Sequence, residues 1–173
     1  MIRRFALASA ILIAAASATP AMADTVAATL DISASVPPKC VFGTNTNITF
    51  GDYDPIVTNA TSGTDLTDSG EIKYTCTVGV SPYITLNQGN YADTGSSEGS
   101  PLRRLKDGSN FLSYNIYTNV ERTTVWGNTN TTGTPGTGNG IEQTVTLYGK
   151  IARGQNVPPG TGYSDTVTAT ISY

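Results

Sequence analysis

One stretch near the N-terminus, residues 25–36, alternates between apolar and polar side chains along its whole length. Six apolar side chains fall on one parity, and Ala27 is the single apolar residue on the other; the six are Val26, Ala28, Leu30, Ile32, Ala34 and Val36. A period of two predicts a β-strand with one buried face. At ~3.3 Å per residue this strand would span roughly 35 Å, about twice the length of a common strand. Pro37 and Pro38 end it, because proline cannot donate to a ladder. What this long, one-sided strand packs against decides the function.

The residues before this stretch predict a secretory signal peptide, residues 1–23. Arg3 and Arg4 supply its positive charge, residues 5–16 form an apolar run, and Ala21-Met22-Ala23 predicts cleavage after Ala23. The alternative is an N-terminal membrane anchor, which needs about 20 apolar residues. No later segment of the sequence is long and apolar enough to cross a membrane.

Cleavage would leave about 150 residues, which suits one domain. The predicted organisation is a signal peptide (1–23), an N-terminal arm (24–38) and a single domain (39–173). Loss of the two leader arginines leaves eight Lys and Arg against thirteen Asp and Glu, a net charge of −5. Such an acidic chain argues against a nucleic-acid partner, which would need a basic face.

The two cysteines, Cys40 and Cys76, are expected to pair in an exported chain. Closing this loop would stabilise the fold by roughly 4 kcal/mol in the chain-entropy model. The alternative is two free, buried thiols.

Behind Cys40 the sequence predicts an all-β fold. Thr, Ser, Gly and Asn are abundant and no long helical period is present. Six principal strands are expected, at residues 48–50, 70–78, 83–87, 111–119, 142–152 and 164–173. Polar loops are expected at 56–69, 90–100 and 129–140, and a turn near Lys106-Asp107-Gly108.

An immunoglobulin-type β-sandwich needs seven strands, and the last predicted strand stops at the end of the chain. The predicted fold class is therefore an incomplete immunoglobulin-like β-sandwich. It is expected to lack its last strand and to carry an N-terminal donor-strand extension. A missing strand exposes an apolar groove and an unpaired edge. The inward residues of the final strand are expected to line the edge of this groove: Val167, Ala169, Ile171 and Tyr173.

The arm and the groove together predict donor-strand exchange, in which the arm of one subunit fills the groove of the next. Backbone pairing at a sheet edge is an established mode of recognition. A head-to-tail contact of this kind does not close on itself and gives a fibre.

Several short motifs run through the predicted mature chain in a fixed order. They are Cys40 with Phe50-Gly51-Asp52-Tyr53-Asp54; Gly70-Glu71-Ile72 leading to Cys76; Arg103 with Leu112-Ser113-Tyr114-Asn115-Ile116-Tyr117; Trp126-Gly127; Tyr148-Gly149-Lys150-Ile151 with Gly154-Gln155; and Gly162-Tyr163-Ser164-Asp165-Thr166-Val167 through Ile171 to Tyr173. In this order and spacing, the chain resembles the spore coat protein U-like family, whose members include subunits of archaic chaperone–usher pili.

The resemblance implies export through the periplasm to the cell surface. A periplasmic chaperone would lend a strand to the groove, and an outer-membrane usher would exchange it for the arm of a neighbouring pilin subunit. Such pili are associated with surface adhesion and biofilm. A single domain implies a rod or minor subunit, because a tip adhesin would carry a second domain. The spore-coat branch of the family is the alternative, and the two are not separated by sequence.

Other functions have weaker support. The chain contains no His, so neither a catalytic residue nor a metal site is predicted, and no cofactor is expected. Asp52 and Asp54 could form a glycosidase-like carboxylate pair, but solvation in a turn beside Pro55 is the plainer interpretation. Asp65, Asp68 and Glu71 could hold calcium, although the EF-hand spacing is absent.

Two remaining patterns suggest binding. Arg103-Arg104 with Lys106 is the main basic cluster. It is interpreted as a solvated turn or, secondly, as the partner of a carboxylate on a neighbouring strand. Trp126 and the nine tyrosines could form a sugar-stacking platform, the mark of a secreted carbohydrate-binding module, but core packing is the more common role. Asn47, Asn59 and Asn130 match the glycosylation pattern by chance.

Overall fold

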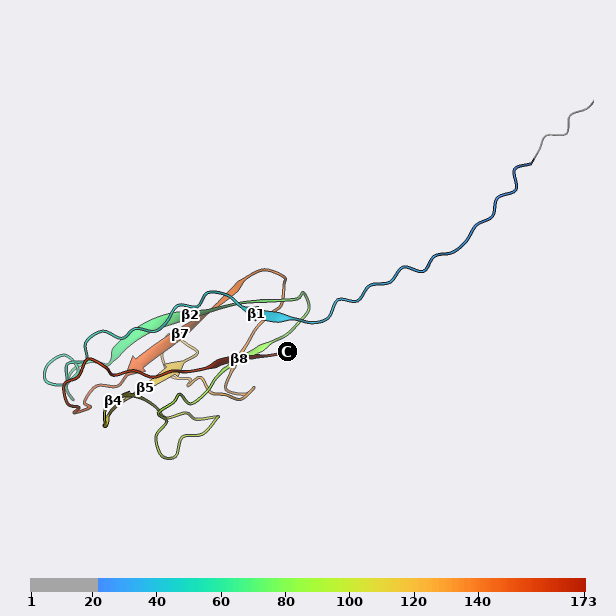
Figure 1. Ribbon diagram of the computed structural model, residues 1–173. Helices are drawn as coiled ribbons and strands as arrows, with labels where there is room; N and C mark the ends of the chain where they lie inside the picture. The colour runs from blue at the N-terminus through green and yellow to red at the C-terminus, as the bar shows by residue number, and fades with distance from the viewer. Residues whose placement is uncertain (1–21) are drawn as a thin grey trace, which may run out of the picture. The chain divides into compact units, whose positions relative to one another are not determined.

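The computed structural model describes residues 22–173, which contain eight β-strands and no helix (Figure 1). The strands are β1 (Cys40–Phe42), β2 (Leu66–Cys76), β3 (Tyr83–Leu86), β4 (Arg103–Asp107), β5 (Asn110–Tyr117), β6 (Thr134–Pro135), β7 (Gln143–Ile151) and β8 (Ala169–Ser172). The predicted signal peptide falls almost wholly outside these residues, so cleavage after Ala23 stays a prediction. The chain divides into two units, one ending at Ser35 and the other running from Val36 to Tyr173.

The strands of the second unit form two antiparallel sheets. The larger has the order β1-β2-β7-β5-β4, and the smaller has the order β6-β3-β8. The longest ladder of the larger sheet joins β2 to β7, from Leu66 opposite Ile151 to Tyr74 opposite Gln143. The predicted all-β, incomplete immunoglobulin-like sandwich is confirmed.

The core lies between the sheets and follows from the period of two in each strand. Ile72, Tyr74 and Cys76 of β2 are buried, as are Leu112, Tyr114 and Ile116 of β5. Ile84 and Leu86 of the smaller sheet pack in the same cluster, together with Trp126. One apolar cluster therefore joins both sheets.

Cys40 and Cys76 form the predicted disulfide, with an S–S distance of 2.02 Å. The two residues lie directly opposite each other in the β1–β2 pair. The bond therefore fixes the short strand β1 at the edge of the larger sheet.

One strand was missed and one strand prediction was wrong. The turn predicted near Lys106-Asp107-Gly108 is present at Gly108 and Ser109, but residues 103–107 before it form a strand, β4. The sequence does not reveal β4, because its inward residues are Arg103 and Leu105 in place of the usual apolar series. Residues 48–50 form no strand. Beside them Asn45 Oδ1 accepts from the Lys73 amide and Asp68 Oδ2 accepts from the Thr49 amide, so side chains take the place of ladder carbonyls.

The final strand is shorter than predicted because the chain changes sheets along it. Ser164 exchanges two backbone hydrogen bonds with Lys106 of β4, of 3.0 and 3.1 Å. From Thr168 onward the chain pairs instead with the β3 side, and β8 covers only Ala169–Ser172. The predicted alternation persists, since Val167, Ala169 and Ile171 are partly buried and pack against the core.

Residues 22–38 form no strand in the part of the chain that the structure describes. The apolar side chains of this arm are open to solvent, with Val26 96% and Ile32 95% exposed. Within residues 22–173 there is no helix that is long and apolar enough to cross a membrane.

Gly149 of β7 allows the side chains of Phe50 and Ile48 to approach the sheet closely. A Cβ atom there would lie 2.7 Å from Phe50 Cζ and 2.9 Å from Ile48 Cγ2. The glycine therefore lets both side chains rest on the sheet, where they line a groove described below.

Gly149→Ala is expected to destabilise the chain by about 1–3 kcal/mol, because the new methyl group would displace Phe50 and Ile48 from the sheet. Urea denaturation measures the change. Gly99→Ala is the matched control, because no atom lies within 4 Å of its added Cβ. Equal stability of the two variants would contradict this role of Gly149.

Candidate functional site

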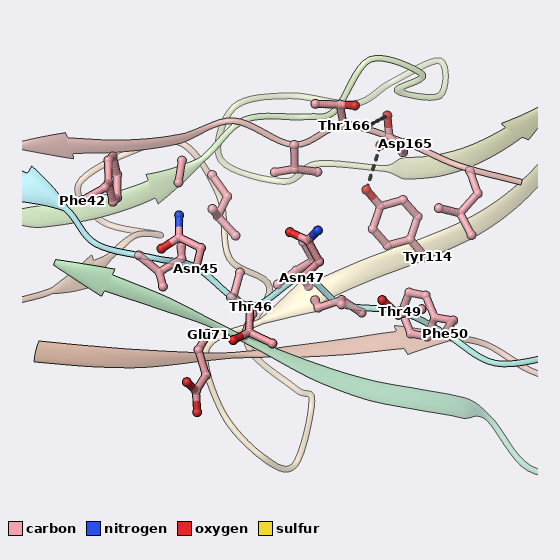
Figure 2. Close-up of a pocket in the computed structure, with 18 residues that line it drawn as sticks. Phe42, Asn45, Thr46, Asn47, Thr49, Phe50, Glu71, Tyr114, Asp165 and Thr166 are labelled. Atoms are coloured by element: carbon pink, nitrogen blue, oxygen red, sulfur yellow. Dashed lines mark hydrogen bonds between the residues drawn. The ribbon is translucent and has the colours of Figure 1, made fainter.

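An open cavity of about 590 Å³ lies between residues 42–50 and residues 165–169. Figure 2 shows Phe42, Asn45, Asn47 and Phe50 along one side and Asp165 and Thr166 along the other. Its floor consists of core residues contributed by both sheets: Ile72, Leu86, Leu105, Tyr114, Ile116 and Leu147. The apolar interior of the sandwich is therefore reachable from outside at this edge.

A second cavity of about 840 Å³ continues the first, between residues 48–56 and residues 156–165. The two share five lining residues: Ile48, Thr49, Phe50, Leu105 and Asp165. Leu112 and Ile151 belong to the floor of the second cavity. We call the combined depression the groove.

The N-terminal wall of the groove is loosely attached to β2. The amide of Gly43 donates to Lys73 O at 2.7 Å, and Thr46 exchanges two hydrogen bonds of 2.9 Å with Glu71. Since β1 ends the larger sheet, this wall has no strand on its other side among the described residues.

The C-terminal wall presents a backbone edge to the groove. Thr168 donates to Asn87 Oδ1 and accepts from the Asn87 amide, so its peptide groups point toward the β3 side. Neighbouring residues of an extended chain point the opposite way, which directs the peptide groups of Val167 and Ala169 toward the groove. In residues 22–173, β8 is also the last strand of its sheet.

Two of the four predicted groove residues, Val167 and Ala169, line the first cavity. Ile171 packs on the core opposite Ile84 of β3 and lines neither cavity described above. Tyr173 is 60% exposed. Ile171 and Tyr173 therefore lie beyond one end of the groove, the end at which β8 pairs with β3.

Asp165 and Tyr114 form a polar spot in this apolar lining. The Tyr114 hydroxyl donates to Asp165 Oδ2 at 2.7 Å, while Oδ1 accepts from the amides of Asn90 and Thr166 (Figure 2). Burial, together with the hydrogen bond to Asp165, raises the pKa of Tyr114 far above its ordinary value. The phenol therefore stays protonated and fixes the chain where it passes between the sheets.

Arg103, expected in a solvated turn, is instead 1% exposed and joins the two sheets. Its Nη2 donates to the carbonyls of Leu86, Asn87 and Trp126 at 3.1, 2.6 and 2.9 Å. Nε also donates to Asn87 O, and Nη1 donates to Asn115 Oδ1. Burial lowers the pKa of Arg103 to about 10, so the group remains charged at neutral pH.

The candidate acidic sites have other partners. Asp54 accepts from the amides of Ile56, Val57 and Thr58, and these bonds, that of Ile56 foremost, lower its pKa. This is a turn-forming carboxylate rather than half of a catalytic pair. Asp65 lies near the cations of Lys150 and Arg153, at 4.0 and 3.8 Å, so it does not join a calcium site.

Trp126 is fully buried, and its indole Nε1 donates to Ile84 O at 2.9 Å. It belongs to the core and cannot serve as a sugar-stacking surface. Arg104 forms an ion pair with Asp93 at 2.9 Å, but this carboxylate lies in the loop before β4 and not on a neighbouring strand as predicted. Of the glycosylation patterns, Asn59 is buried in a loop and Asn47 lies in the groove.

Sequence reasoning found the groove from the number of strands but missed most of its lining. Ile48 and Phe50 were placed on a strand, and neither Tyr114 nor Asp165 was assigned to the groove. A signal was available, because Ser164-Asp165 interrupts the apolar series of the final strand with a charge.

The fold and the groove define a β-sandwich with one open edge, where the apolar interior is reachable from outside. The family model of the Spore Coat Protein U domain matches residues 26–170. The chain belongs to this family, which confirms the resemblance seen in its sequence. It is 42% identical to Protein U of Myxococcus xanthus over 160 residues, covering 90% of this chain and 89% of that protein.

A solved structure shares the fold. The crystal structure of the CsuC–CsuE chaperone–tip adhesion subunit pre-assembly complex, from the archaic chaperone–usher Csu pili of Acinetobacter baumannii, matches with a TM-score of 0.56 and 21% identity. The match covers 80% of this chain. The chain spans only 40% of the length of the chain that it matches.

Proposed function

We propose that this protein is a structural subunit of an archaic chaperone–usher pilus, and that it polymerises by donor-strand exchange. The observation that carries the proposal is the groove, an apolar opening between two sheet edges whose floor is the core itself. The arm supplies a matching strand, with apolar residues on one face and polar residues on the other.

The burial energy is large enough for assembly. Six apolar side chains of the arm entering a groove would contribute on the order of 10 kcal/mol. The costs of association offset part of this. The peptide groups of Val167 and Ala169 would add backbone pairing along the C-terminal wall.

The same proposal includes the route of assembly. A periplasmic chaperone occupies the groove first, and an outer-membrane usher then exchanges it for the arm of a neighbouring subunit. The finished fibre stands on the cell surface and supports adhesion and biofilm. The similarity to a chaperone-bound adhesion subunit supports the chaperone step.

A second candidate is a spore or cell-envelope coat subunit. The observation in its favour is the similarity to Protein U along nearly the whole of that protein. It would use the same strand exchange and differ in its location. A carbohydrate-binding module in place of a subunit is disfavoured, because its sandwich would be complete.

The proposal is tested with adjacent residues of the arm. Ile32→Asp is expected to abolish polymers, because a charge entering an apolar groove weakens binding at least about a hundredfold. Ser33→Asp, on the opposite face, is the matched control and should polymerise normally. Ladders on gels of unboiled samples, with electron microscopy, give the measurement. Deletion of residues 24–36 should have the effect of Ile32→Asp.

A mixing experiment tests the direction of the contact. A chain without its arm keeps an intact groove, and an Ala169→Arg chain keeps an intact arm. Mixed together they should form dimers and nothing longer, because only one productive contact exists. Polymers from either variant alone would contradict donor-strand exchange.

A further inference from the structure

The outer face of the larger sheet carries a cluster of cations and aromatic rings that the proposed assembly does not use. Its members alternate along their strands with inward-facing residues; they are Arg104 and Lys106 of β4, Phe111, Ser113 and Tyr117 of β5, and Tyr148 and Lys150 of β7. Tyr91 and Arg122 join them from adjacent loops. We call these nine residues the basic–aromatic face.

Each cation on this face lies over an aromatic ring. The distances from cation to ring centroid are 4.1 Å for Arg104 to Phe111, 5.0 Å for Lys106 to Tyr91, 4.9 Å for Lys150 to Tyr117 and 5.7 Å for Arg122 to Tyr148. Stacking of this kind holds the charged groups in place at the surface. The cations are therefore partly ordered before any ligand arrives.

A cavity of about 230 Å³ lies between the two halves of the face. Arg104 and Ser113 line one part of it, and Tyr117 and Lys150 line another. This volume is below that of a pocket for a drug-sized ligand and suits a single small ring or acidic group. The guanidinium of Arg104 is held at this cavity by the carbonyls of Tyr91 and Ala92 and by Asp93.

Charge is segregated onto this face. Half of the eight Lys and Arg residues that follow the predicted signal peptide lie on it, although the chain as a whole is acidic. Asp93 pairs with Arg104 at 2.9 Å, and Asp65 lies 4.0 Å from Lys150, so two carboxylates face four cations. The surplus positive charge attracts a polyanion.

We propose that the basic–aromatic face binds an anionic polysaccharide. Repeated acidic groups along such a chain can meet Arg104 with Lys106 on one side of the cavity and Lys150 with Arg122 on the other. The hydroxyl groups of the sugar would exchange hydrogen bonds with the hydroxyls of Ser113 and Tyr117, which line the cavity. An acidic protein partner is the alternative, and the experiment below separates it from a polysaccharide.

The test measures binding of the full chain to polygalacturonate, heparin and neutral dextran by titration calorimetry at low ionic strength. Polygalacturonate or heparin should bind, dextran should not, and added salt should weaken binding. Arg104→Gln and Lys150→Gln should each lower the affinity about tenfold, the loss expected for one charged contact. Lys73→Gln, on the same sheet but outside the face, is the matched control and should stay within about twofold.

The alternatives give different results. Failure of both polyanions to bind, or an equal loss in Lys73→Gln, would overturn the proposal. Binding of poly-L-glutamate at least as tight as that of polygalacturonate would also overturn it, in favour of an acidic protein partner. If the variants do not fold, NMR shift changes in the wild-type chain decide, because they should centre on the Ser113 and Tyr117 amides.

Discussion

Arg103→Met is expected to lower the free energy of unfolding by about 3–5 kcal/mol. Methionine fills a similar volume, so the loss isolates the hydrogen bonds rather than the packing. Three buried carbonyls, those of Leu86, Asn87 and Trp126, would lose their shared donor. Each buried group left without a partner costs about 1–3 kcal/mol.

The measurement is urea denaturation followed by the fluorescence of Trp126, the single tryptophan of the chain. Arg104→Met is the matched control, because it changes the adjacent residue on the outer side of β4. It removes a partly exposed ion pair, one ring contact and two hydrogen bonds to the loop carbonyls of Tyr91 and Ala92, together about 1–2 kcal/mol. Equal losses in the two variants would show that Arg103 does not join the sheets.

Removal of the disulfide, in the double variant Cys40→Ala with Cys76→Ala, is expected to cost about 4 kcal/mol. The sequence separation of 36 sets the entropy that the bond removes from the unfolded chain. The native geometry adds a local effect, because Cys40 fixes β1 and hence the start of the N-terminal groove wall. Assembly should therefore weaken together with stability.

Denaturation of the oxidised chain, the reduced chain and the double variant gives the measurement. The reduced chain and the double variant should unfold at similar urea concentrations, well below that of the oxidised chain. An oxidised chain no more stable than the other two would rule out a stabilising role for the bond.

Much of the fold was predictable because most strands bury one face. Residues 70–78 and 142–152 alternate clearly, and both coincide largely with observed strands, β2 and β7. β4 was missed because its inward position carries Arg103, which a pattern of apolar residues cannot reveal. The carbonyls of Leu86, Asn87 and Trp126, with the side-chain oxygen of Asn115, make that position tolerable, and all of them are distant in sequence.

The groove was predictable in kind but not in detail. A shortage of strands indicates an open edge, and alternation along the final strand points to Val167 and Ala169, which line the first cavity. The change of sheet after Ser164 depends on its pairing with Lys106, which no local pattern encodes. The basic–aromatic face was likewise hidden, because its rings and cations come from separate strands and loops.

The change of sheet at the C-terminal wall has a mechanical consequence. The segment from Ser164 to Ser172 is bonded to β4 at one end and to β3 at the other. A tensile load applied to a strand seated beside Val167 would pass into both sheets together. Rupture would then require many hydrogen bonds to shear at once rather than to peel apart in sequence, which is how a thread of such units could withstand drag in flowing liquid.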